Sequence, residues 1–271
     1  MIKLYKISPN VFVATPENDT VNMGGFKLLN YSIAVDSGRS MGNGKELRNS
    51  LEKQFNCPII YLLITHCHPD HINGITAFNE TTLVFNKKTE PFLPKNFPKK
   101  EIFQPNKSLI LKDQNSEVEI HHVGGHTPDS CFIYLPSEKV IFAGDLVFSG
   151  FKQPFPWSPG NSNPDKWIQA VKYILQKDLR TIIPGHGPIL NKKELKNILD
   201  FYQNLRDLLL DSIAQGIKLS KIKAPTTALD YELFEKRGIT LNEEFEKDLI
   251  QIGIRRRQAT LRHWYQFYKK R

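Results

Sequence analysis

The chain has 271 residues, a formal net charge of +9 and three cysteines. A chain of this length can bury a full hydrophobic core, and an odd number of widely spaced cysteines argues against a disulfide framework. We see no signal peptide and no apolar run approaching the length of about 18 residues of a membrane span, so we expect a cytoplasmic protein without a membrane partner. The basic residues concentrate in 86–107 and 255–271, away from most of the histidines, which favours a solvated surface over a nucleic-acid partner.

The first quarter of the chain alternates short apolar runs with turn residues. Three of these runs are typical of meander strands: 11–14, 26–29 and 31–35. Residues 36–38 then read as a turn. The segment 44–55 places Leu47, Leu51 and Phe55 four residues apart, which predicts an amphipathic helix. The run 58–64 is apolar on both faces, as expected of a strand that is covered on both sides.

Strands and helices continue to alternate up to about residue 190. Further strands are expected at 81–85, 108–111, 117–123, 131–135, 140–143 and 181–183. Asn163-Pro164-Asp165 has the composition of a helix start. Residues 87–107 hold four prolines and six lysines, which predicts a surface loop or insertion. This order predicts a layered α/β domain over residues 1–190.

Residues 191–271 are expected to form a helical appendage. One helix is predicted at 195–217 with Gly216 as its stop, and a last one at 242–268, interrupted at Gly253. Arg257, Arg262 and His263 on this last helix could reach an anionic substrate. The alternative is a capping or dimerising bundle with solvated arginines, and a homodimer is one arrangement that it would allow.

The most informative stretch is Thr65-His66-Cys67-His68-Pro69-Asp70-His71, directly after the apolar run 58–64. Alternate residues of an extended segment point the same way, so His66 and His68 can converge on one ion, and Asp70 and His71 can face a second. Imidazole nitrogens and carboxylate oxygens without a required thiolate suit zinc best, with iron or manganese as alternatives. The competing interpretation is a polar loop that happens to be rich in histidine.

Three more candidate ligands follow apolar strands and are flanked by glycine: His126, Asp145 and His186. Glycine lets the backbone approach a site closely. Singly, each of these residues is typical of a turn or a hydrogen-bonding position. As an ordered set with the His66 motif, they predict one metal centre.

With this set of seven, residues 11–190 resemble the metallo-β-lactamase superfamily, which implies a four-layer αββα sandwich. The resemblance implies a first metal held by His66, His68 and His126, a second held by Asp70, His71 and His186, and Asp145 bridging both. It therefore implies two Zn²⁺ ions. True β-lactamases of this fold usually have cysteine or serine at the position of Asp145, so the aspartate favours the glyoxalase II-like branch. The match to glyoxalase II itself is not close, because its Cys-Gly-Lys-Phe-Tyr-like stretch is absent.

The function expected from these residues is a dinuclear metal-dependent hydrolase acting on a small molecule. A metal-bridging hydroxide would attack an ester-like carbonyl in a thioester, ester or lactone, with Asp70 as a catalytic proton acceptor. Two alternatives on the same fold stay open: an iron-dependent sulfur dioxygenase, and a phosphodiesterase or RNA-processing nuclease.

The aromatic, proline-rich loop 148–161 is the candidate for the substrate pocket wall, with Lys152, Phe155 and Trp157 as substrate-binding residues. It could equally be hydrophobic cover for the helix at Trp167. Four residues are candidates to orient the metal-binding imidazoles: Thr65, Thr127, Asp129 and Ser130.

Overall fold

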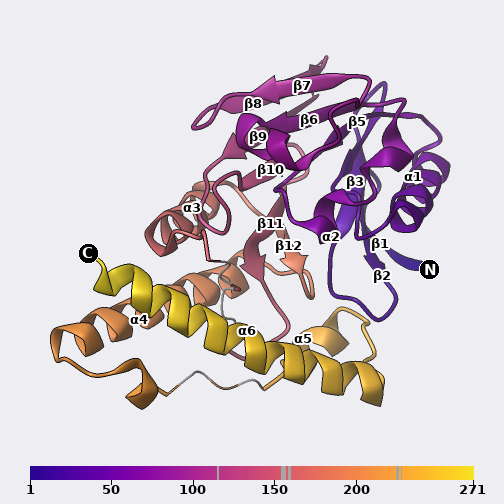
Figure 1. The fold of residues 1–271 in the computed structure, drawn as a ribbon. Coiled ribbons are helices and arrows are strands. Elements are labelled where there is room, and N and C mark those ends of the chain that lie inside the picture. Colours follow the sequence, from indigo (N-terminus) through magenta and orange to yellow (C-terminus); the bar gives the residue numbers. More distant parts are fainter. Residues whose placement is uncertain (115, 154–156, 158–159, 224–225, 227) are drawn as a thin grey trace.

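The computed structural model describes residues 1–114, 116–153, 157, 160–223, 226 and 228–271. Its strands form two sheets (Figure 1). The first sheet has seven strands in chain order: β1 (Ile2–Ser8), β2 (Val11–Pro16), β3 (Met23–Lys27), β4 (Ser32–Val35), β5 (Ile59–Leu63), β6 (Thr82–Asn86) and β7 (Lys100–Phe103). The second has five, in the order β12 (Thr181–His186), β11 (Val140–Phe148), β10 (Cys131–Leu135), β9 (Ser116–His122) and β8 (Ser108–Asp113).

Helices cover the outer face of each sheet. The α-helices are α1 (Met41–Phe55), α2 (Pro69–Ile72), α3 (Pro164–Gln176), α4 (Lys192–Ala214), α5 (Tyr231–Lys236) and α6 (Glu243–Lys269). Three short 3₁₀ turns lie at Ile75–Phe78, Lys87–Phe92 and Leu219–Lys221. The expected amphipathic helix is α1, whose Leu47, Leu51 and Phe55 are buried.

Three hydrophobic clusters define the layers. Phe26 and Ile33 of the first sheet pack against Ile133 and Phe142 of the second, so the core between the sheets is apolar. A second cluster joins Leu51 of α1 to the other face of the first sheet. A third cluster covers the outer face of the second sheet with residues of α3, α4 and α6. Because apolar side chains line both faces of each sheet, the predicted αββα sandwich is confirmed.

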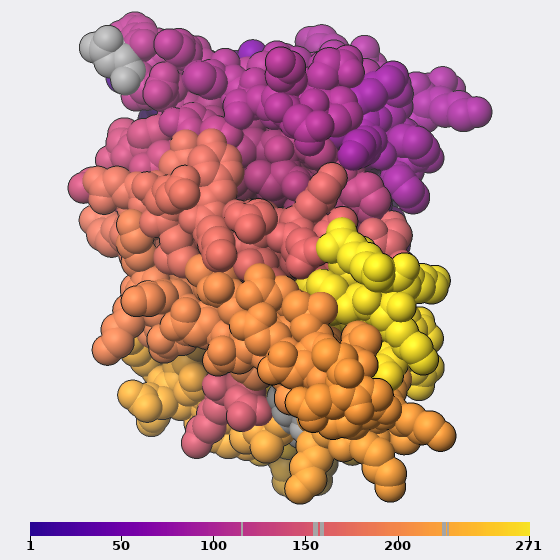
Figure 2. Space-filling view, turned by 90° about the vertical axis from the view of Figure 1, so that its left-hand side faces the viewer, coloured from indigo at the N-terminus to yellow at the C-terminus, as the bar shows by residue number. Residues whose placement is uncertain are grey.

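Residues 191–271, which follow β12 and are drawn in orange and yellow, lie at one end of the molecule (Figure 2). Leu195 of α4 and Trp264 of α6 belong to the same cluster as Ile141 of β11 and Trp167 of α3. The two helices therefore share a core with the second sheet, and the domain boundary expected near residue 190 stays a prediction. Among the described residues, we find no helix with the length and hydropathy that a bilayer crossing requires.

Two local predictions were wrong. Residues 87–107 contain β7, which pairs in parallel with β6 and contributes buried Phe103 to the core, so the segment supplies an edge strand. Its prolines lie outside Lys100–Phe103, where they do not disturb the ladder. The last helix is also continuous through Gly253, because a single buried glycine in a packed helix lowers its stability without ending it.

Candidate metal centre

The seven candidate ligands meet at the ends of strands from both sheets. His66 and His68 follow β5, and Asp70 and His71 lie on the short helix α2 that begins at Pro69. His126 lies in the loop after β9, Asp145 within β11 and His186 at the end of β12. Asp145 was expected just after a strand, but β11 continues to Phe148 with two shifts of register against β12. The structure thus brings together all seven residues.

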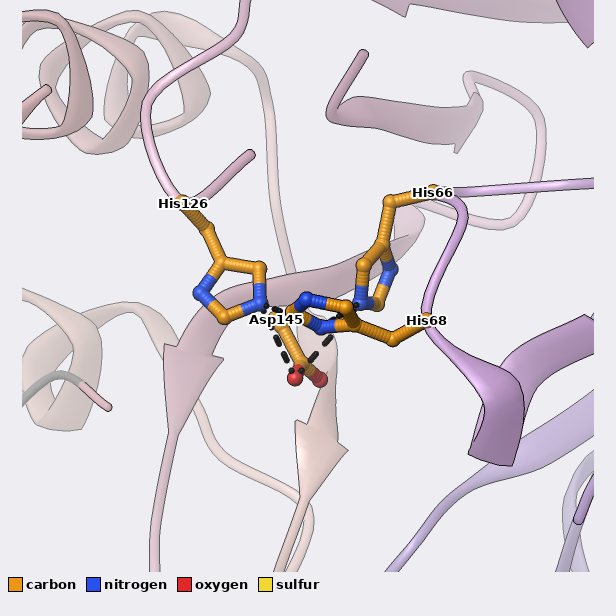
Figure 3. Close-up of side chains that lie close together, drawn as sticks. All are labelled: His66, His68, His126 and Asp145. Carbon is orange, nitrogen blue, oxygen red and sulfur yellow. Dashed lines mark hydrogen bonds and ion pairs between the residues drawn. The ribbon is translucent and has the colours of Figure 1, made fainter. Parts of the chain in front are cut away.

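The first group of ligand atoms is formed by His66, His68, His126 and Asp145 (Figure 3). His68 Nδ1 lies 3.1 Å from His66 Nε2 and 3.0 Å from His126 Nε2. Asp145 Oδ2 lies 3.3 Å from His126 Nε2 and 3.6 Å from His66 Nε2. These atoms are all within 4.8 Å of one another, which is close enough to share one ion.

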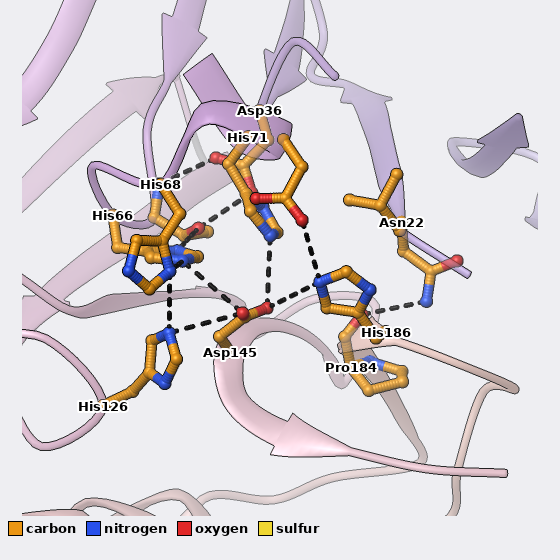
Figure 4. Close-up of polar contacts among 12 residues, drawn as sticks. Asn22, Asp36, His66, His68, His71, His126, Asp145, Pro184 and His186 are labelled. Carbon is orange, nitrogen blue, oxygen red and sulfur yellow. Dashed lines mark hydrogen bonds and ion pairs between the residues drawn. The ribbon is translucent and has the colours of Figure 1, made fainter. Parts of the chain in front are cut away.

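The second group is formed by Asp70, His71 and His186 (Figure 4). Asp70 Oδ2 lies 3.3 Å from His186 Nε2. The other oxygen of Asp145, Oδ1, faces this group, at 3.1 Å from His71 Nε2 and 3.5 Å from His186 Nε2. Asp145 therefore presents one oxygen to each group, as a ligand shared by two ions would.

The hydrogen-bond network fixes where two of the imidazole protons lie. Thr65 Oγ1 donates its proton to Asp36 Oδ2 at 2.8 Å, so it can only accept from His66 Nδ1, which lies 3.0 Å away. His71 Nδ1 donates to the same Asp36 oxygen at 2.8 Å. Both rings then carry their proton on Nδ1, and each Nε2 turns a lone pair toward the centre. This is the tautomer that a metal requires.

Several atoms at the centre have no hydrogen-bond partner within the described part of the chain. They are His71 Nε2, His126 Nδ1, His186 Nε2 and both carboxylate oxygens of Asp145. Four of these five face one another across the centre, and the lone pair that the neutral His71 ring carries on Nε2 lies 3.1 Å from Asp145 Oδ1. Burying polar groups without partners costs free energy, and cations bound between these atoms would offset that cost. The residues present fit divalent metal ions.

Electrostatics at the centre agree with this fit. Burial lowers the pKa of His68 to about 4, with a further contribution from His66, so that ring stays neutral and able to bind. Burial also lowers the pKa of His126 well below its usual range. Burial alone would lower the pKa of His71 too, but the carboxylates of Asp145 and Asp36 raise it well above its usual value. The potential at His71 Nε2 is thus strongly negative, which favours a cation there.

Three polar residues that the sequence analysis did not single out hold the ligands in place. Asp36, at the end of β4, accepts from Thr65 and His71 as described above. Thr20 Oγ1 lies 3.1 Å from His186 Nδ1. Asn22 Nδ2 donates to Pro184 O at 2.9 Å and to Gly187 O at 2.8 Å, which fixes the end of β12 that carries His186 (Figure 4). Because β4 and β5 are parallel neighbours, their carboxyl ends share one edge, which brings Asp36 beside His71. The one hint in the sequence is that Asp36 directly follows the apolar run 31–35, as His66 follows its own run.

Of the four residues expected to orient the imidazoles, one contacts a ligand. Thr65 bonds His66, whereas Thr127 and Ser130 bond each other and Asp129 accepts from Thr89. The latter three shape the turn between β9 and β10 instead.

Two glycines allow the chain to approach the centre closely. A Cβ at Gly185 would lie 2.0 Å from Asp145 Oδ1. A Cβ at Gly125 would lie 2.7 Å from Trp167 Cα, and its φ of +112° favours glycine in any case. These residues bring the strands of His186 and His126 to the ligand positions.

A cavity of about 340 Å³ opens beside the second group of ligands. Phe148, Ser149 and His186 line it from the sandwich, and α6 lines it from the opposite side. Trp157 is part of this wall, and its ring centre lies 5.9 Å from that of His68. Lys152 lines a neighbouring cavity that also contains Glu194 and Lys236. Phe155 lies outside the described residues.

The three polar residues predicted on the last helix lie elsewhere. Arg257 is buried and donates to Gln153 O at 2.9 Å, Arg262 is exposed, and His263 Nε2 lies 3.1 Å from Ser162 O. The arginine of α6 that lines the cavity is Arg256, one position before Arg257.

Comparison with known proteins agrees with the fold and the centre. The family model described as the metallo-beta-lactamase superfamily matches residues 31–84 and 85–186. The Metallo-beta-lactamase type 2 of Bacillus sp. (strain 170) is 28% identical over 214 residues, covering 73% of this chain and 81% of the relative. The Beta-lactamase-like protein 2 homolog of Caenorhabditis elegans is 26% identical over 167 residues, covering 59% of this chain and 53% of that protein.

Solved structures show the same fold. A metallo-beta-lactamase from Pontibacter korlensis superposes with a TM-score of 0.64 at 21% identity, covering 75% of this chain and all 100% of that chain. A metallo-beta-lactamase from Hirschia baltica superposes with a TM-score of 0.63 at 17% identity, covering 74% of this chain and 97% of that chain.

The αββα fold and the buried histidine and aspartate cluster define a metal-dependent hydrolase that binds divalent metal. The family match extends over more than half of the chain and includes all seven candidate ligands. The chain belongs to the metallo-beta-lactamase superfamily.

Proposed function

We propose that this hydrolase holds two zinc ions and cleaves an ester-like carbonyl compound, namely a thioester, an ester or a lactone. The observation that carries the proposal is the placement of Asp145. Its Oδ2 faces His66 and His126, and its Oδ1 faces His71 and His186. A carboxylate divided in this way supports two ions rather than one.

The donor set supports zinc. Five imidazoles and two carboxylates face the centre, and the described residues place no thiolate in either group. Zinc accepts this mixture, and magnesium or calcium would prefer oxygen alone. Bound zinc lowers the pKa of a water ligand to about 7 and polarises carbonyl oxygens, which supplies a nucleophile and an electrophile at neutral pH.

The protein side chains would contribute positioning and proton transfer. Asp70, which is the proposed catalytic residue, lies near the cavity that opens beside His186 and has Arg39 Nη2 at 3.6 Å from its Oδ2. It would accept the proton that the attacking water releases. Trp157 and Phe148 form an apolar wall that limits the access of bulk water to the carbonyl.

A lactam amide is the second candidate substrate. The Bacillus relatives are named metallo-beta-lactamases, and the same acyl chemistry would open a lactam. Against it stands Asp145, because the resemblance described above implies cysteine or serine at this position in true β-lactamases. The Caenorhabditis relative gives slight support to the glyoxalase II-like branch.

Metal analysis and a substrate panel test the proposal together. We expect the purified protein to contain two zinc ions per chain and to hydrolyse a thioester, a lactone or an aryl ester faster than a cephalosporin or a phosphodiester. One iron per chain with oxygen consumption would instead support a sulfur dioxygenase. A preference for the phosphodiester would support a nuclease.

Asp145→Ala tests the shared ligand. We expect it to lose zinc and to lower hydrolysis by at least about 100-fold, since it removes an oxygen from each group of ligands. Asp178→Ala is the matched control, because Asp178 is exposed and pairs with Lys139 at 2.6 Å far from the centre. An Asp145→Ala protein that keeps both ions and full activity would refute the role of Asp145.

A further inference from the structure

The cavity beside the metal centre has one wall from the last helix. Phe245, Leu249, Ile252 and Arg256 line it at spacings of four, three and four residues, so they form one face of α6. In Figure 1, α6 runs across the end of the molecule at which β11 and β12 terminate. Phe151 and Phe234 add to the apolar part of the same cavity.

Two of the charged residues that line the cavity neutralise each other. Arg39 donates from Nε to Asp19 Oδ2 at 2.9 Å and from Nη2 to Asp19 Oδ1 at 3.2 Å. The same guanidinium lies 3.6 Å from Asp70. Arg39 therefore already has its anionic partners.

Arg256 is the remaining charged residue in the lining of the cavity. Within the described part of the chain, it has no carboxylate at ion-pair distance and no hydrogen-bond acceptor. Its guanidinium carbon lies 4.4 Å from the centre of the Trp157 ring, so an aromatic face holds the cation without neutralising it. The neighbouring arginines face elsewhere, with Arg255 exposed and Arg257 buried in the core.

Leaving this guanidinium half-buried without an anion is unfavourable. Burial lowers the pKa of Arg256, while the charges of Asp145 and Asp70 act in the opposite direction. Arginine nevertheless stays protonated in proteins. Bound divalent ions would neutralise the two aspartates and leave Arg256 as an uncompensated cation beside the metal centre.

The geometry points to a substrate that carries an oxyanion, a carboxylate or a phosphate, received by Arg256, with an apolar body between that anion and the carbonyl at the metal centre. This inference rests on the proposed acyl hydrolysis and specifies its substrate class. The planar guanidinium matches an oxyanion with two parallel hydrogen bonds. Trp157 fixes one face of the guanidinium, which leaves its edge free for the ligand. The apolar side chains Phe151, Phe234 and Leu249 would contact the body of the substrate.

A pair of esters that differ only in charge tests this inference on activity. The anionic member is the mono-4-nitrophenyl ester of suberic acid, whose carboxylate is too far from the ester to attack it, and the neutral member is its methyl ester. We expect Arg256→Gln to lower kcat/KM for the anionic ester by about 10- to 100-fold, because a charge-assisted hydrogen bond is lost, and to change the neutral ester by less than about threefold. Arg262→Gln, an exposed arginine on the same helix, is the matched control and should change neither.

Binding to the zinc-loaded protein provides a second measurement that needs no hydrolysis. Calorimetry with 4-phenylbutyrate, 4-phenylbutyramide and phenyl phosphate should show that wild type prefers an anion over the amide. Arg256→Gln should weaken the preferred anion by about 10-fold or more and leave the amide unchanged. The anion that loses more affinity identifies carboxylate or phosphate as the recognised group.

The two measurements separate the inference from the proposed function. If wild type hydrolyses no ester but Arg256→Gln still weakens anion binding selectively, the acyl hydrolysis fails and the oxyanion site stands. Equal effects of Arg256→Gln on charged and neutral ligands, or an equal effect of Arg262→Gln, would overturn the oxyanion site. Arg256→Lys should restore part of the anion binding because it keeps the charge without the planar fork.

Discussion

Within the described part of the chain, histidine and carboxylate side chains gather at the metal centre and at a second, largely buried cluster, and the two differ in how their protons are matched. One is the metal centre, where lone pairs face one another. The other lies on the face of β9 turned toward α3. There Glu119 Oε2 accepts from His121 Nε2 at 2.6 Å and from Lys177 Nζ at 2.5 Å. His121 Nδ1 lies 2.7 Å from Ser108 Oγ, which can donate to it.

The contrast shows what distinguishes a metal site from a structural polar cluster. Both contain imidazole and carboxylate groups, and both are largely buried. In the Glu119 cluster, Glu119 Oε2 and His121 Nδ1 both have donors, so the cluster needs no ion. At Asp145 neither oxygen has a hydrogen-bond partner within the described residues, so this cluster lacks positive charge that bound cations would supply. The two clusters therefore differ in the match between hydrogen-bond donors and acceptors, and not in their residue types.

The largest effect is expected from a change that displaces Asp145 without altering any ligand. In Gly185→Ala the new Cβ would meet Asp145 Oδ1 at 2.0 Å and the backbone carbon of Gly144 at 2.6 Å. The strand has to shift, so we expect zinc binding to fail and hydrolysis to fall by more than about 100-fold. Zinc content and activity should be measured together with the melting temperature of the metal-stripped protein.

Gly42→Ala is the control for this change. Among the described residues, its Cβ would have one neighbour within 4 Å, Ser40 Oγ at 3.5 Å, which is an ordinary van der Waals contact. Because Gly42 lies on α1, alanine there should stabilise the protein by about 0.5–1 kcal/mol and leave zinc binding intact. If Gly185→Ala kept both ions and its activity, the close approach of β12 to Asp145 would not be what fixes the bridging carboxylate.

A smaller effect is expected at Asp36, which contacts ligands and would bind no metal itself. The carboxylate accepts three hydrogen bonds, two from Thr65 and one from His71. In Asp36→Asn the side-chain amide has one acceptor oxygen instead of two. Its NH₂ group would then face at least one of the donors that the carboxylate now accepts from, namely those of Thr65 and His71. We expect zinc affinity to fall by about 10- to 100-fold, as measured by competition with a chelator.

Asp113→Asn is a matched control for Asp36→Asn. Asp113 is also buried and accepts two hydrogen bonds from Asn30, but it lies on β8. The Asp113→Asn protein should be less stable than wild type and should bind zinc with wild-type affinity. Equal zinc affinity in the two variants would mean that Asp36 does not position His71.

Much of this centre could be predicted from the sequence because its ligands are ordered by strands. His66 and His186 follow short apolar runs, and His126 follows an alternating stretch. All three segments are predicted to be strands, so the convergence of the histidines follows from the sheets. Asp36 could not be predicted in the same way. It reads as a turn residue, and its role depends on the parallel pairing of β4 with β5, which no local pattern in the chain encodes.

The wall of the cavity was harder to predict for a similar reason. The arginine that faces the centre is Arg256, whereas Arg257 and Arg262 were considered from the sequence. Successive side chains on a helix point in directions about 100° apart. The rotation of α6 about its axis therefore decides which arginine lines the cavity. That rotation is set by packing of Leu261 and Trp264 against α3 and α4, which the sequence pattern indicates only coarsely. Residues 100–103 were missed because the prolines around them hide a short edge strand.

The smallest effect is expected at the satisfied cluster, where the test is a pH dependence without any metal. Burial alone would raise the pKa of Glu119, but hydrogen bonds from Lys177 and His121 lower it below its usual value. A carboxyl whose pKa is lowered in the folded state adds stability above its unfolded pKa of about 4.5 and loses it as the pH falls through the folded value. Glu119→Gln should therefore unfold more easily than wild type by about 1 kcal/mol at neutral pH, with zinc content unchanged. In urea unfolding of metal-stripped protein, this difference should shrink as the pH falls below about 4.5.

A difference that stays constant down to acidic pH would show that the lost contact is not ionic. Loss of zinc from Glu119→Gln would show that the two clusters are coupled rather than independent.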